Sequence, residues 1–343
     1  MSSLLELPIL DRHARPSWAL GPRSISNLRM LRISVTDRCN LKCHYCMPEA
    51  GMAFSDKDEL LGIDQICEIA GAALDLGVHS IKLTGGEPTV RSDLEQIITS
   101  LAAMGVPDLS LTTNGMQLQR RASALQDAGL DRVTVSMDSL VPERFKRLTG
   151  GGRLDLVRTG LDRLDQLGFT NTKINVVMVR GVNDDELIQL AQLSLDRDWT
   201  IRFIEYMPLG QSRLLEMDED PLVPTDSLIQ RLRDQFGRLE EVPRHMESGM
   251  GPAEVLKIPG AVGRIGFIHA MTRPFCDTCN RLRVTARGEL RSCLFDGGEI
   301  DLLPLLGSGG PGAIQEAFRA SVAMKPEVAH GSRGDRAMSQ LGG

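Results

Sequence analysis

The chain alternates between two apolar patterns, one with the period of a strand and one with the period of a helix. Segments rich in β-branched and apolar residues occur at 31–37, 80–86, 109–115, 132–138, 172–179 and 199–207. Between most of them, stretches such as 64–77, 92–105 and 185–198 repeat apolar residues at helical spacing. Six strands in alternation with helices predict an α/β fold with a parallel sheet.

Polar or glycine residues end several of the candidate strands, at 36–37, 84–86, 113–115 and 136–138. Ligands of parallel α/β folds bind at the carboxyl ends of strands, so we expect the active face there. Six successive units suit either an incomplete barrel or a wound sheet. The regularity fails after Met207, because residues 208–260 are rich in proline, glycine and charge before a further strand at 263–270. This change predicts a domain boundary.

Composition excludes several classes of protein. The 343 residues are 42% hydrophobic and 24% charged, which suits one large or two moderate globular domains. The net charge of -6 offers duplex nucleic acid no overall attraction, so any anion site must be local. The first two dozen residues lack a signal-peptide core, and no apolar run has membrane length. We therefore expect a cytoplasmic protein with a flexible N-terminal arm.

Six of the seven cysteines form two groups, which favours two metal or cluster sites over a secreted disulfide framework. The first group is Cys39, Cys43 and Cys46, in one short loop after a predicted strand. A structural zinc site needs four ligands, and the local candidate His44 lies between two cysteines, where the loop would direct it away from a shared metal. Three thiolates on an iron–sulfur cube leave one iron open for a ligand, and we prefer that reading.

The second group again offers three thiols, Cys276, Cys279 and Cys293. A zinc ribbon remains an alternative here, because C-x2-C is a common zinc element and His269 or Cys67 could supply a fourth ligand through folding. Cys67 itself lies on an apolar helical face, which predicts a buried core residue.

Several cations fall where they could meet an anion. Arg281 and Arg283 flank one residue, so an extended segment directs both side chains to the same face. Arg32, Lys173 and Arg202 lie on three different predicted strands. The alternative is a scatter of solvated surface charges. Arg32 and Arg202 argue against it, because an unpaired charge inside an apolar run is costly.

The motifs together resemble a known family. C-x3-C-x2-C with Tyr45 before the last cysteine, followed by TGGEP (84–88), resembles the radical S-adenosylmethionine (SAM) enzymes. The further segments LTTNG, VTVSMDSLVPERF, RGVNDDE, IRFIEYMP, FCDTCNRLRVTARGELRSCLF and the terminal GG resemble the family of molybdenum cofactor biosynthesis protein A, the GTP 3′,8-cyclases. This resemblance runs from about Leu28 to Gly343 and is more specific than the first motif alone.

The resemblance implies a fold and a division of the chain. We expect an incomplete (β/α)6 barrel of the radical SAM type over residues 28–208, after a flexible arm over 1–27. Residues 209–343 would form a C-terminal extension that carries a second iron–sulfur cluster and ends in a Gly-Gly tail. Each cysteine group would hold one [4Fe–4S] cluster.

The resemblance also implies roles for named residues. The residues expected to contact SAM are Tyr45, Gly86, Ser136 and Met207. The residues expected to contact GTP are Arg32, Lys82, Thr112, Lys173, Arg202, Arg281, Leu282 and Arg283. The residues expected to act in catalysis are Arg281, Arg283, Gly342 and Gly343. Ser80 departs from the family, many members of which have a basic residue there. We assign no chemical role to RGVNDDE, because Asn183 is predicted to be the N-cap of a helix with acidic residues in its first turn.

The activity implied is the first step of molybdenum cofactor (molybdopterin) biosynthesis. A 5′-deoxyadenosyl radical from SAM would remove the ribose 3′ hydrogen of GTP, and the carbon radical would attack guanine C8 to give 3′,8-cyclo-7,8-dihydroguanosine 5′-triphosphate. The implied partners are a flavodoxin- or ferredoxin-like electron donor, a downstream cyclic pyranopterin monophosphate synthase and a second copy of the chain. The alternatives are another twin-cluster radical SAM enzyme, such as a peptide-modifying maturase, and a structural zinc or cluster protein without turnover.

Overall fold

A computed structural model describes most of the chain after residue 20. The described residues are 21–48, 51–209, 212, 214, 219–243, 251–295, 299–307, 310–327 and 337–341. Gly342 and Gly343, for which the sequence predicts a catalytic role, lie outside them, as do residues 1–20 of the predicted N-terminal arm.

Six strands and the helices that connect them form the first part of the fold. The strands are β1 (Met30–Ser34), β2 (Ser80–Thr84), β3 (Asp108–Thr113), β4 (Arg132–Ser136), β5 (Thr172–Met178) and β6 (Trp199–Glu205). The helices are α1 (Ile63–Asp75), α2 (Leu94–Ala103), α3 (Leu118–Asp127), α4 (Pro142–Leu148), α5 (Leu154–Gln166) and α6 (Leu187–Asp196). All six predicted strands are confirmed within three residues at each end, and the helices predicted over 64–77, 92–105 and 185–198 are confirmed within two.

The C-terminal part supplies further elements. They are α7 (Thr225–Phe236), β7 (Glu240–Glu241), β8 (Glu254–Lys257), β9 (Arg264–Ile268), β10 (Arg281–Val284), β11 (Glu289–Arg291), β12 (Glu299–Asp301) and α8 (Gly310–Ala323). Short 3₁₀ turns include η2 (Ile25–Asn27), η5 (Asp184–Glu186), η8 (Cys276–Thr278) and η10 (Met338–Gln340).

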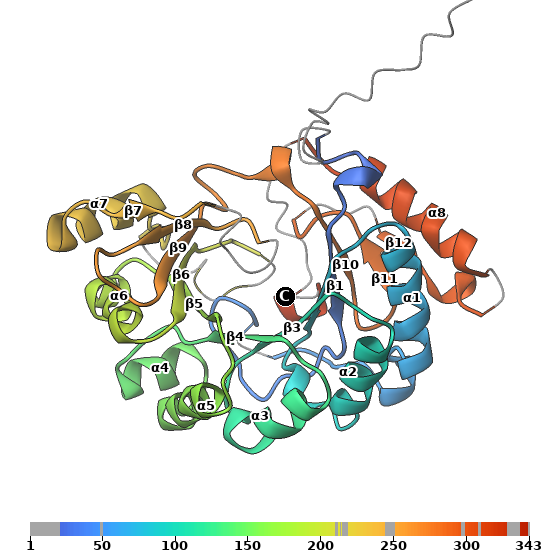
Figure 1. Cartoon of the computed structure of the whole chain (residues 1–343), viewed down its shortest axis with the longest axis horizontal. Coiled ribbons are helices and arrows are strands. Elements are labelled where there is room, and N and C mark those ends of the chain that lie inside the picture. The colour runs from blue at the N-terminus through green and yellow to red at the C-terminus, as the bar shows by residue number, and fades with distance from the viewer. Residues whose placement is uncertain are drawn as a thin grey trace, which may run out of the picture.

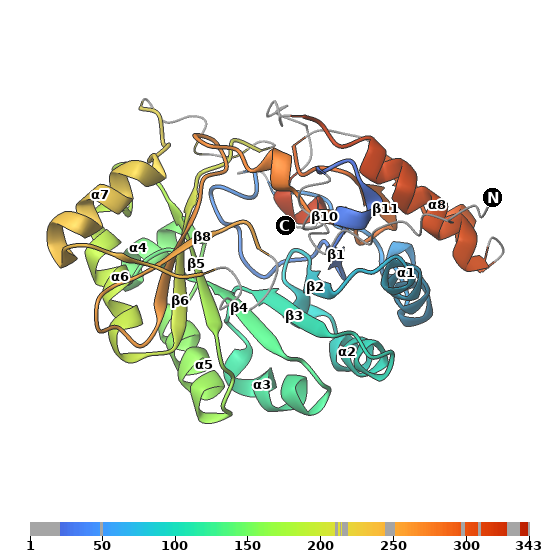
Figure 2. The same ribbon diagram turned by 45° about the horizontal axis from the view of Figure 1, so that its top comes forward.

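The strands of the described residues form one sheet in the order β12-β11-β10-β1-β2-β3-β4-β5-β6-β9-β8-β7. Strands β1 to β6 run parallel in chain order, and β10 and β9 add a parallel neighbour at either side. Figure 1 shows the sheet as a curved arc with helices α1 to α6 along its outer side, and Figure 2 shows the same arc turned by 45°. The C-terminal segments thus extend both edges of the sheet that the first six strands begin.

The core lies between the sheet and its outer helices. In β2 every residue is buried, as expected for a parallel strand covered on both faces. Helix α1 buries Ile66, Ile69, Ala70 and Ala73 at helical spacing against this side. The other side of the strands therefore remains for polar side chains, which enter the hollow of the arc.

No helix of the described chain is both long and apolar enough to span a membrane.

Candidate active site

A cavity of about 310 Å³ opens at the carboxyl ends of the parallel strands, on the inner side of the arc. Its volume is within the range of small-molecule sites. All six grouped cysteines line it: Cys39, Cys43, Cys46, Cys276, Cys279 and Cys293. The predicted active face is therefore confirmed as the place where the two cysteine groups meet, although more than 200 residues separate them in the chain.

The loop that carries the first group is fixed by backbone and carboxylate hydrogen bonds. The Gly86 N–H donates to the Thr36 carbonyl at 2.7 Å, and the Glu87 N–H donates to the Arg38 carbonyl at 2.8 Å. Glu87 itself is buried, and its carboxylate accepts from the Thr113 hydroxyl and the Asn114 N–H, each at 2.6 Å. The ends of β1, β2 and β3 are thus tied together directly beneath Cys39.

Gly86 is required by this packing. A Cβ at residue 86 would lie 2.5 Å from the carbonyl oxygen of Asp37 and closer still to that of Arg38. Backbone of the cysteine loop fills the space that a Cβ would need. Gly86 nevertheless lines the cavity, so its predicted contact with SAM stays a prediction.

Burial makes the first three thiols poor acids in the absence of a cation. It raises the pKa of Cys39 to about 11, with a further contribution from the Glu87 carboxylate. It raises the pKa of Cys46 to about 12, with Cys39 adding to the shift. The pKa of Cys43 is also raised, by burial first and then by Cys46 and Asp138. Three close thiols of this kind become thiolates only with a positively charged partner such as iron, so the donor set fits a metal cluster.

The second group is assembled by segments from several elements. Cys276 opens η8, Cys279 closes it, and Cys293 follows β11, which pairs antiparallel with β10. The loop before Cys276 is anchored by Glu205, a buried carboxylate at the end of β6 that accepts from the N–H groups of Met271 and Thr272 at 2.8 and 2.9 Å.

Cys279 differs from the first three thiols in its charge environment. Burial opposes its ionisation, but Arg281 and Lys325 outweigh burial and lower the pKa of the thiol to about 7. The ammonium of Lys325 donates to the Cys279 carbonyl at 2.8 Å and lies 3.7 Å from its sulfur. A thiolate is therefore readily formed here, as an iron ligand must be.

The fourth ligands considered for zinc lie elsewhere. His269 is engaged with Thr225 and, at 2.8 Å, with Glu254. Cys67 lies on the outer helix α1, and the prediction of a core position for it is wrong, because its side chain is only half-buried there. Among the described residues no group of three or more His, Cys, Asp or Glu side chains is placed to hold a single metal ion.

Cations from neighbouring strands form a row across the cavity wall. Arg283 of β10 pairs in register with Arg32 of β1, which pairs in turn with Lys82 of β2. All three line the cavity. Burial, and after it the charges of Arg283, Arg281 and Arg202, lowers the pKa of Arg32. Burial and then Arg202, Arg32 and Lys173 likewise lower the pKa of Lys82. The alternative of solvated surface charges is therefore wrong for this row.

The remaining residues predicted to contact GTP differ in how they lie relative to the cavity. Arg202 and Thr112 line the cavity from β6 and β3. Lys173 lies on the same face of β5 as Asn175 and Val177, which line it. Leu282 is fully buried in the hydrophobic core, as its place between Arg281 and Arg283 requires, so only its main chain could contact a substrate.

The residues predicted to contact SAM also line the cavity. Tyr45, Gly86, Ser136 and Met207 all contribute to its wall. The Tyr45 hydroxyl donates to Asp138 at 2.8 Å, and burial raises the pKa of that carboxyl to about 6. Asn175 was not predicted to be a site residue, although it lies on the same face of β5 as Lys173. Its side-chain oxygen is buried and has no hydrogen-bond partner in the described part of the chain, so it can accept a bond from a ligand.

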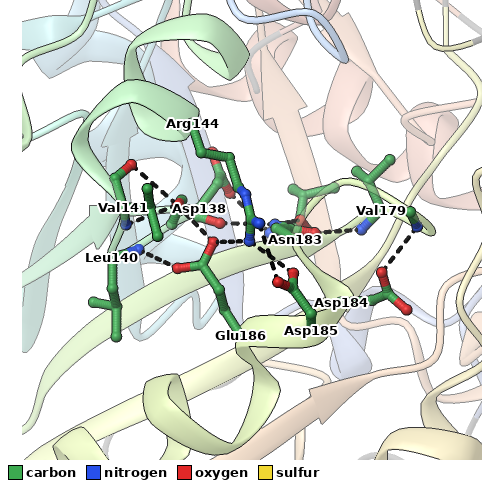
Figure 3. Close-up of polar contacts among 12 residues, drawn as sticks. Asp138, Leu140, Val141, Arg144, Val179, Asn183, Asp184, Asp185 and Glu186 are labelled. Carbon is green, nitrogen blue, oxygen red and sulfur yellow. Dashed lines mark hydrogen bonds and ion pairs between the residues drawn. The ribbon is translucent and has the colours of Figure 1, made fainter.

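The segment 181–186 joins the ends of β4 and β5 (Figure 3). Asn183 is in the N-cap position of η5, as predicted, but its side chain makes no capping bond. Its amide donates to the carbonyls of Asp138 and Val177 at 2.7 and 2.9 Å, and its oxygen accepts from the Val179 N–H at 2.8 Å. The Glu186 carboxylate accepts from the Ser139 hydroxyl at 2.7 Å and from the Leu140 N–H at 2.6 Å. The motif holds the strand end that presents Asp138 to Tyr45.

The last described segment, 337–341, returns to this site. Met338 and Ser339 line the cavity, and the Met338 N–H donates to the Cys46 carbonyl at 3.4 Å. The residues next to Gly342 thus lie against the first cysteine group, while Gly342 and Gly343 themselves are outside the described residues.

The chain matches two protein families over most of its length. The radical SAM superfamily matches residues 33–194, and the family described as Molybdenum Cofactor Synthesis C matches residues 199–331. A protein of Pelotomaculum thermopropionicum named GTP 3′,8-cyclase is 42% identical over 321 residues, covering 92% of this chain and 98% of the relative. The chain belongs to the GTP 3′,8-cyclase family. A family member from a Cyanothece species is 43% identical over 329 residues, covering 91% of this chain and 98% of its own.

Solved structures place the GTP 3′,8-cyclase chain in the radical SAM fold. Streptococcus suis SuiB bound to S-adenosylmethionine superposes with a TM-score of 0.60 at 15% identity, over 84% of this chain and 68% of SuiB. At that identity the likeness shows the fold alone. The predicted α/β class is thereby confirmed. Radical SAM membership rests on the family match over residues 33–194, and it implies SAM and [4Fe–4S] clusters as the cofactors.

Lys325 and Asp138 are the principal site residues that sequence reasoning missed. Asp138 ends a predicted strand within VTVSMDSLVPERF, so its position was marked but its role was not. Lys325 follows α8, 46 residues after Cys279, and only the folded chain brings the two together.

Proposed function

We propose that this protein converts GTP to 3′,8-cyclo-7,8-dihydroguanosine 5′-triphosphate with SAM and two [4Fe–4S] clusters. The observation that carries the proposal is the row of Arg283, Arg32 and Lys82 in the wall of a cavity that both cysteine groups line. Family membership gives the reaction class, and the row explains how an acidic chain can bind a triphosphate.

The fit of the clusters is supported by the donor set. Cys39, Cys43 and Cys46 would hold one cluster, and Cys276, Cys279 and Cys293 the other, each with three thiolates and one open iron. When bound, the first cluster and SAM supply an electron and a carbon-centred radical. The residues around them bind, orient and shield the reactants.

Recognition of the triphosphate follows from charge. Two unit charges roughly 4 Å apart repel by about 4 kcal/mol at an effective dielectric constant of about 20, so the clustered cations gain by taking up an anion. Arginine forks bind phosphate oxygens through two parallel hydrogen bonds. We assign the triphosphate to Arg32, Lys82, Lys173, Arg202, Arg281 and Arg283, with Thr112 and the main chain of Leu282 beside them.

Recognition of SAM is assigned to the other part of the cavity. Tyr45, Gly86, Ser136 and Met207 line the wall around the first cysteine group. The Tyr45–Asp138 bond holds the aromatic ring in place, and the unpartnered oxygen of Asn175 can accept a hydrogen bond from a ligand hydroxyl or amine.

We infer that β1 to β6 with α1 to α6 form the six-unit incomplete barrel expected over residues 28–208. The chain order of these strands and the helices outside the arc support this reading. The match of one family up to residue 194 and of another from residue 199 supports a division close to residue 208. A one-electron donor, a cyclic pyranopterin monophosphate synthase that takes the product, and a homodimer remain our expectations for partners.

The reaction is tested by mass spectrometry of the product. Anaerobically reconstituted protein is incubated with SAM, a reductant and GTP, and in parallel with SAM, reductant and a peptide substrate of a maturase. We expect the cyclised triphosphate and 5′-deoxyadenosine with GTP only. A modified peptide without cyclised nucleotide would favour the maturase alternative.

A further inference from the structure

The ammonium of Lys325 is built into the wall beside the second cysteine group. Its side chain is 3% exposed and lines the cavity. Its Nζ atom donates to the Cys279 carbonyl at 2.8 Å and lies 3.7 Å from the Cys279 sulfur. A buried ammonium is costly unless an anion compensates it, and a Cys279 thiolate is placed to do so.

Both ends of the described chain hold this lysine in place. Helix α8 buries Ile314, Phe318 and Val322 in the core and ends just before Lys325. From the other side, the Arg23 Nε atom donates to the Lys325 carbonyl at 2.9 Å. The residue is therefore positioned by packing and by a long-range bond that does not involve its own charge.

The two cysteine groups have neighbours of opposite charge. The carboxylates of Glu87 and Asp138 line the cavity near the first group, and Asp138 accepts at 2.8 Å from the hydroxyl of Tyr45, one residue before Cys46. Near the second group, the Lys325 ammonium lies 3.7 Å from the Cys279 sulfur, and Arg281 follows Cys279 by two residues. Positive charge and N–H donors near a cluster sulfur stabilise the reduced, more negative state, and so raise its reduction potential.

We propose that Lys325 is a positioning residue that raises the reduction potential of the second cluster through its contact with Cys279. The inference rests on the proposed function, because it takes Cys276, Cys279 and Cys293 as cluster ligands. It goes beyond that function in naming a side chain that sets the reduction potential of the second cluster. Arg281 contributes charge from the other side, but it faces the substrate space and stacks on Phe275 at 4.6 Å.

The test isolates the second cluster in the full-length chain. In a parent protein with Cys39, Cys43 and Cys46 replaced by alanine, iron and sulfide are measured first, and a redox titration then follows the reduced cluster by electron paramagnetic resonance. A parent that binds no iron and sulfide refutes the ligand assignment, and with it this inference, before any potential is read. Lys325→Met, Lys325→Arg and the exposed control Lys146→Met are compared in this background.

We expect Lys325→Met to retain iron and sulfide but to shift the potential downward, with about a tenfold loss in the equilibrium constant for reduction, which is about 59 mV for one electron. Lys325→Arg and Lys146→Met should stay at the parent value. An intact cluster at unchanged potential in Lys325→Met would overturn the proposal. Equal loss of the cluster from the Met and Arg variants would also overturn it, because packing alone would then explain the residue.

GTP binding provides a second readout, in the enzyme with all six cysteines. If Lys325→Met raised the KM for GTP and left the potential unchanged, Lys325 would belong to the triphosphate site instead. If the Met variant alone lost its cluster while Lys325→Arg kept it at the parent potential, the requirement for a cation beside Cys279 would be supported.

Discussion

Arg32 and Arg283 are direct register partners on the parallel strands β1 and β10, so two arginine side chains enter the cavity side by side. They come from opposite ends of the chain, and β10 reaches β1 only because the C-terminal segment crosses to that edge of the sheet. Burial, and then the charge of Arg281, lowers the pKa of Arg283 to about 10. Such a pair is stabilised when a polyanion binds.

Substitution of these arginines should separate substrate binding from cluster binding. We expect Arg281→Ala and Arg283→Ala to lower kcat/KM for GTP by roughly a hundredfold, because loss of a buried charge-assisted contact costs about 2–5 kcal/mol. The absorbance of both clusters should persist. The matched control is Arg287→Ala, an exposed arginine after the same strand that pairs with Glu59. Loss of the second cluster in the Arg281 or Arg283 variants would make them structural supports instead.

The Gly86 turn gives a prediction about assembly. In Gly86→Ala the new Cβ would collide with the carbonyls of Asp37 and Arg38, and relief of such overpacking costs about 1–3 kcal/mol. We expect iron and sulfide at the first site to fall while the second site stays loaded, as measured by metal analysis after reconstitution. Gly62→Ala is the control, because its nearest neighbour to a new Cβ is a flexible side-chain atom at 3.7 Å. Full iron content with weakened SAM binding alone would instead show that the missing Cβ makes room for SAM.

The Asn183 network predicts a difference in stability between two neighbouring positions. Asn183→Ala removes three buried hydrogen bonds at the ends of β4 and β5, and each unsatisfied buried group costs about 1–3 kcal/mol. Asp185→Ala removes an exposed ion pair with Arg144, which contributes about 0–1 kcal/mol. The Tm of the protein before cluster loading should therefore drop clearly for Asn183→Ala and little for Asp185→Ala. Equal drops would show that the bridging role of Asn183 is unimportant.

The sequence predicted the features that depend on local pattern. Strand positions, the alternation that places Arg281 and Arg283 on one face, and the carboxyl-end location of the site all follow from short-range periodicity. One interpretation was incomplete because it needed neighbours from distant parts of the chain. Asn183 is in the predicted N-cap position, but its side chain bridges two strand ends and makes no capping bond.

The role of Lys325 could not be predicted, because it also depends on residues that are distant in the sequence. Nothing in its own segment marks a charge partner, and only the position of α8, beside α1 at the β11–β12 end of the sheet, brings its ammonium to Cys279. Cys67 is the converse case, since an apolar helical pattern suggested a core position but the residue lies at the margin of the buried face of α1.

The Gly-Gly tail is expected to act on the reaction and not on folding. Deletion of Gly342 and Gly343, or addition of a C-terminal tag, should leave both clusters and the affinity for GTP near normal but strongly lower the yield of cyclised product. The motivation is that Met338 and Ser339, just before these glycines, line the cavity next to Cys46. Product yield at saturating SAM and GTP is the measurement. An unchanged yield from the truncated enzyme would make the glycines a dispensable terminus.

Iron and sulfide analysis of the anaerobically reconstituted protein tests whether the two cysteine groups hold two iron–sulfur clusters, on which the proposed function depends. We predict about eight iron and eight sulfide per chain, and about four of each when either Cys39, Cys43 and Cys46 or Cys276, Cys279 and Cys293 are replaced by alanine. The variant that lacks the second group should still cleave SAM slowly. Stoichiometric zinc with only traces of iron and sulfide in the wild-type protein would show that the cysteine groups do not hold iron–sulfur clusters, and would contradict the proposed function.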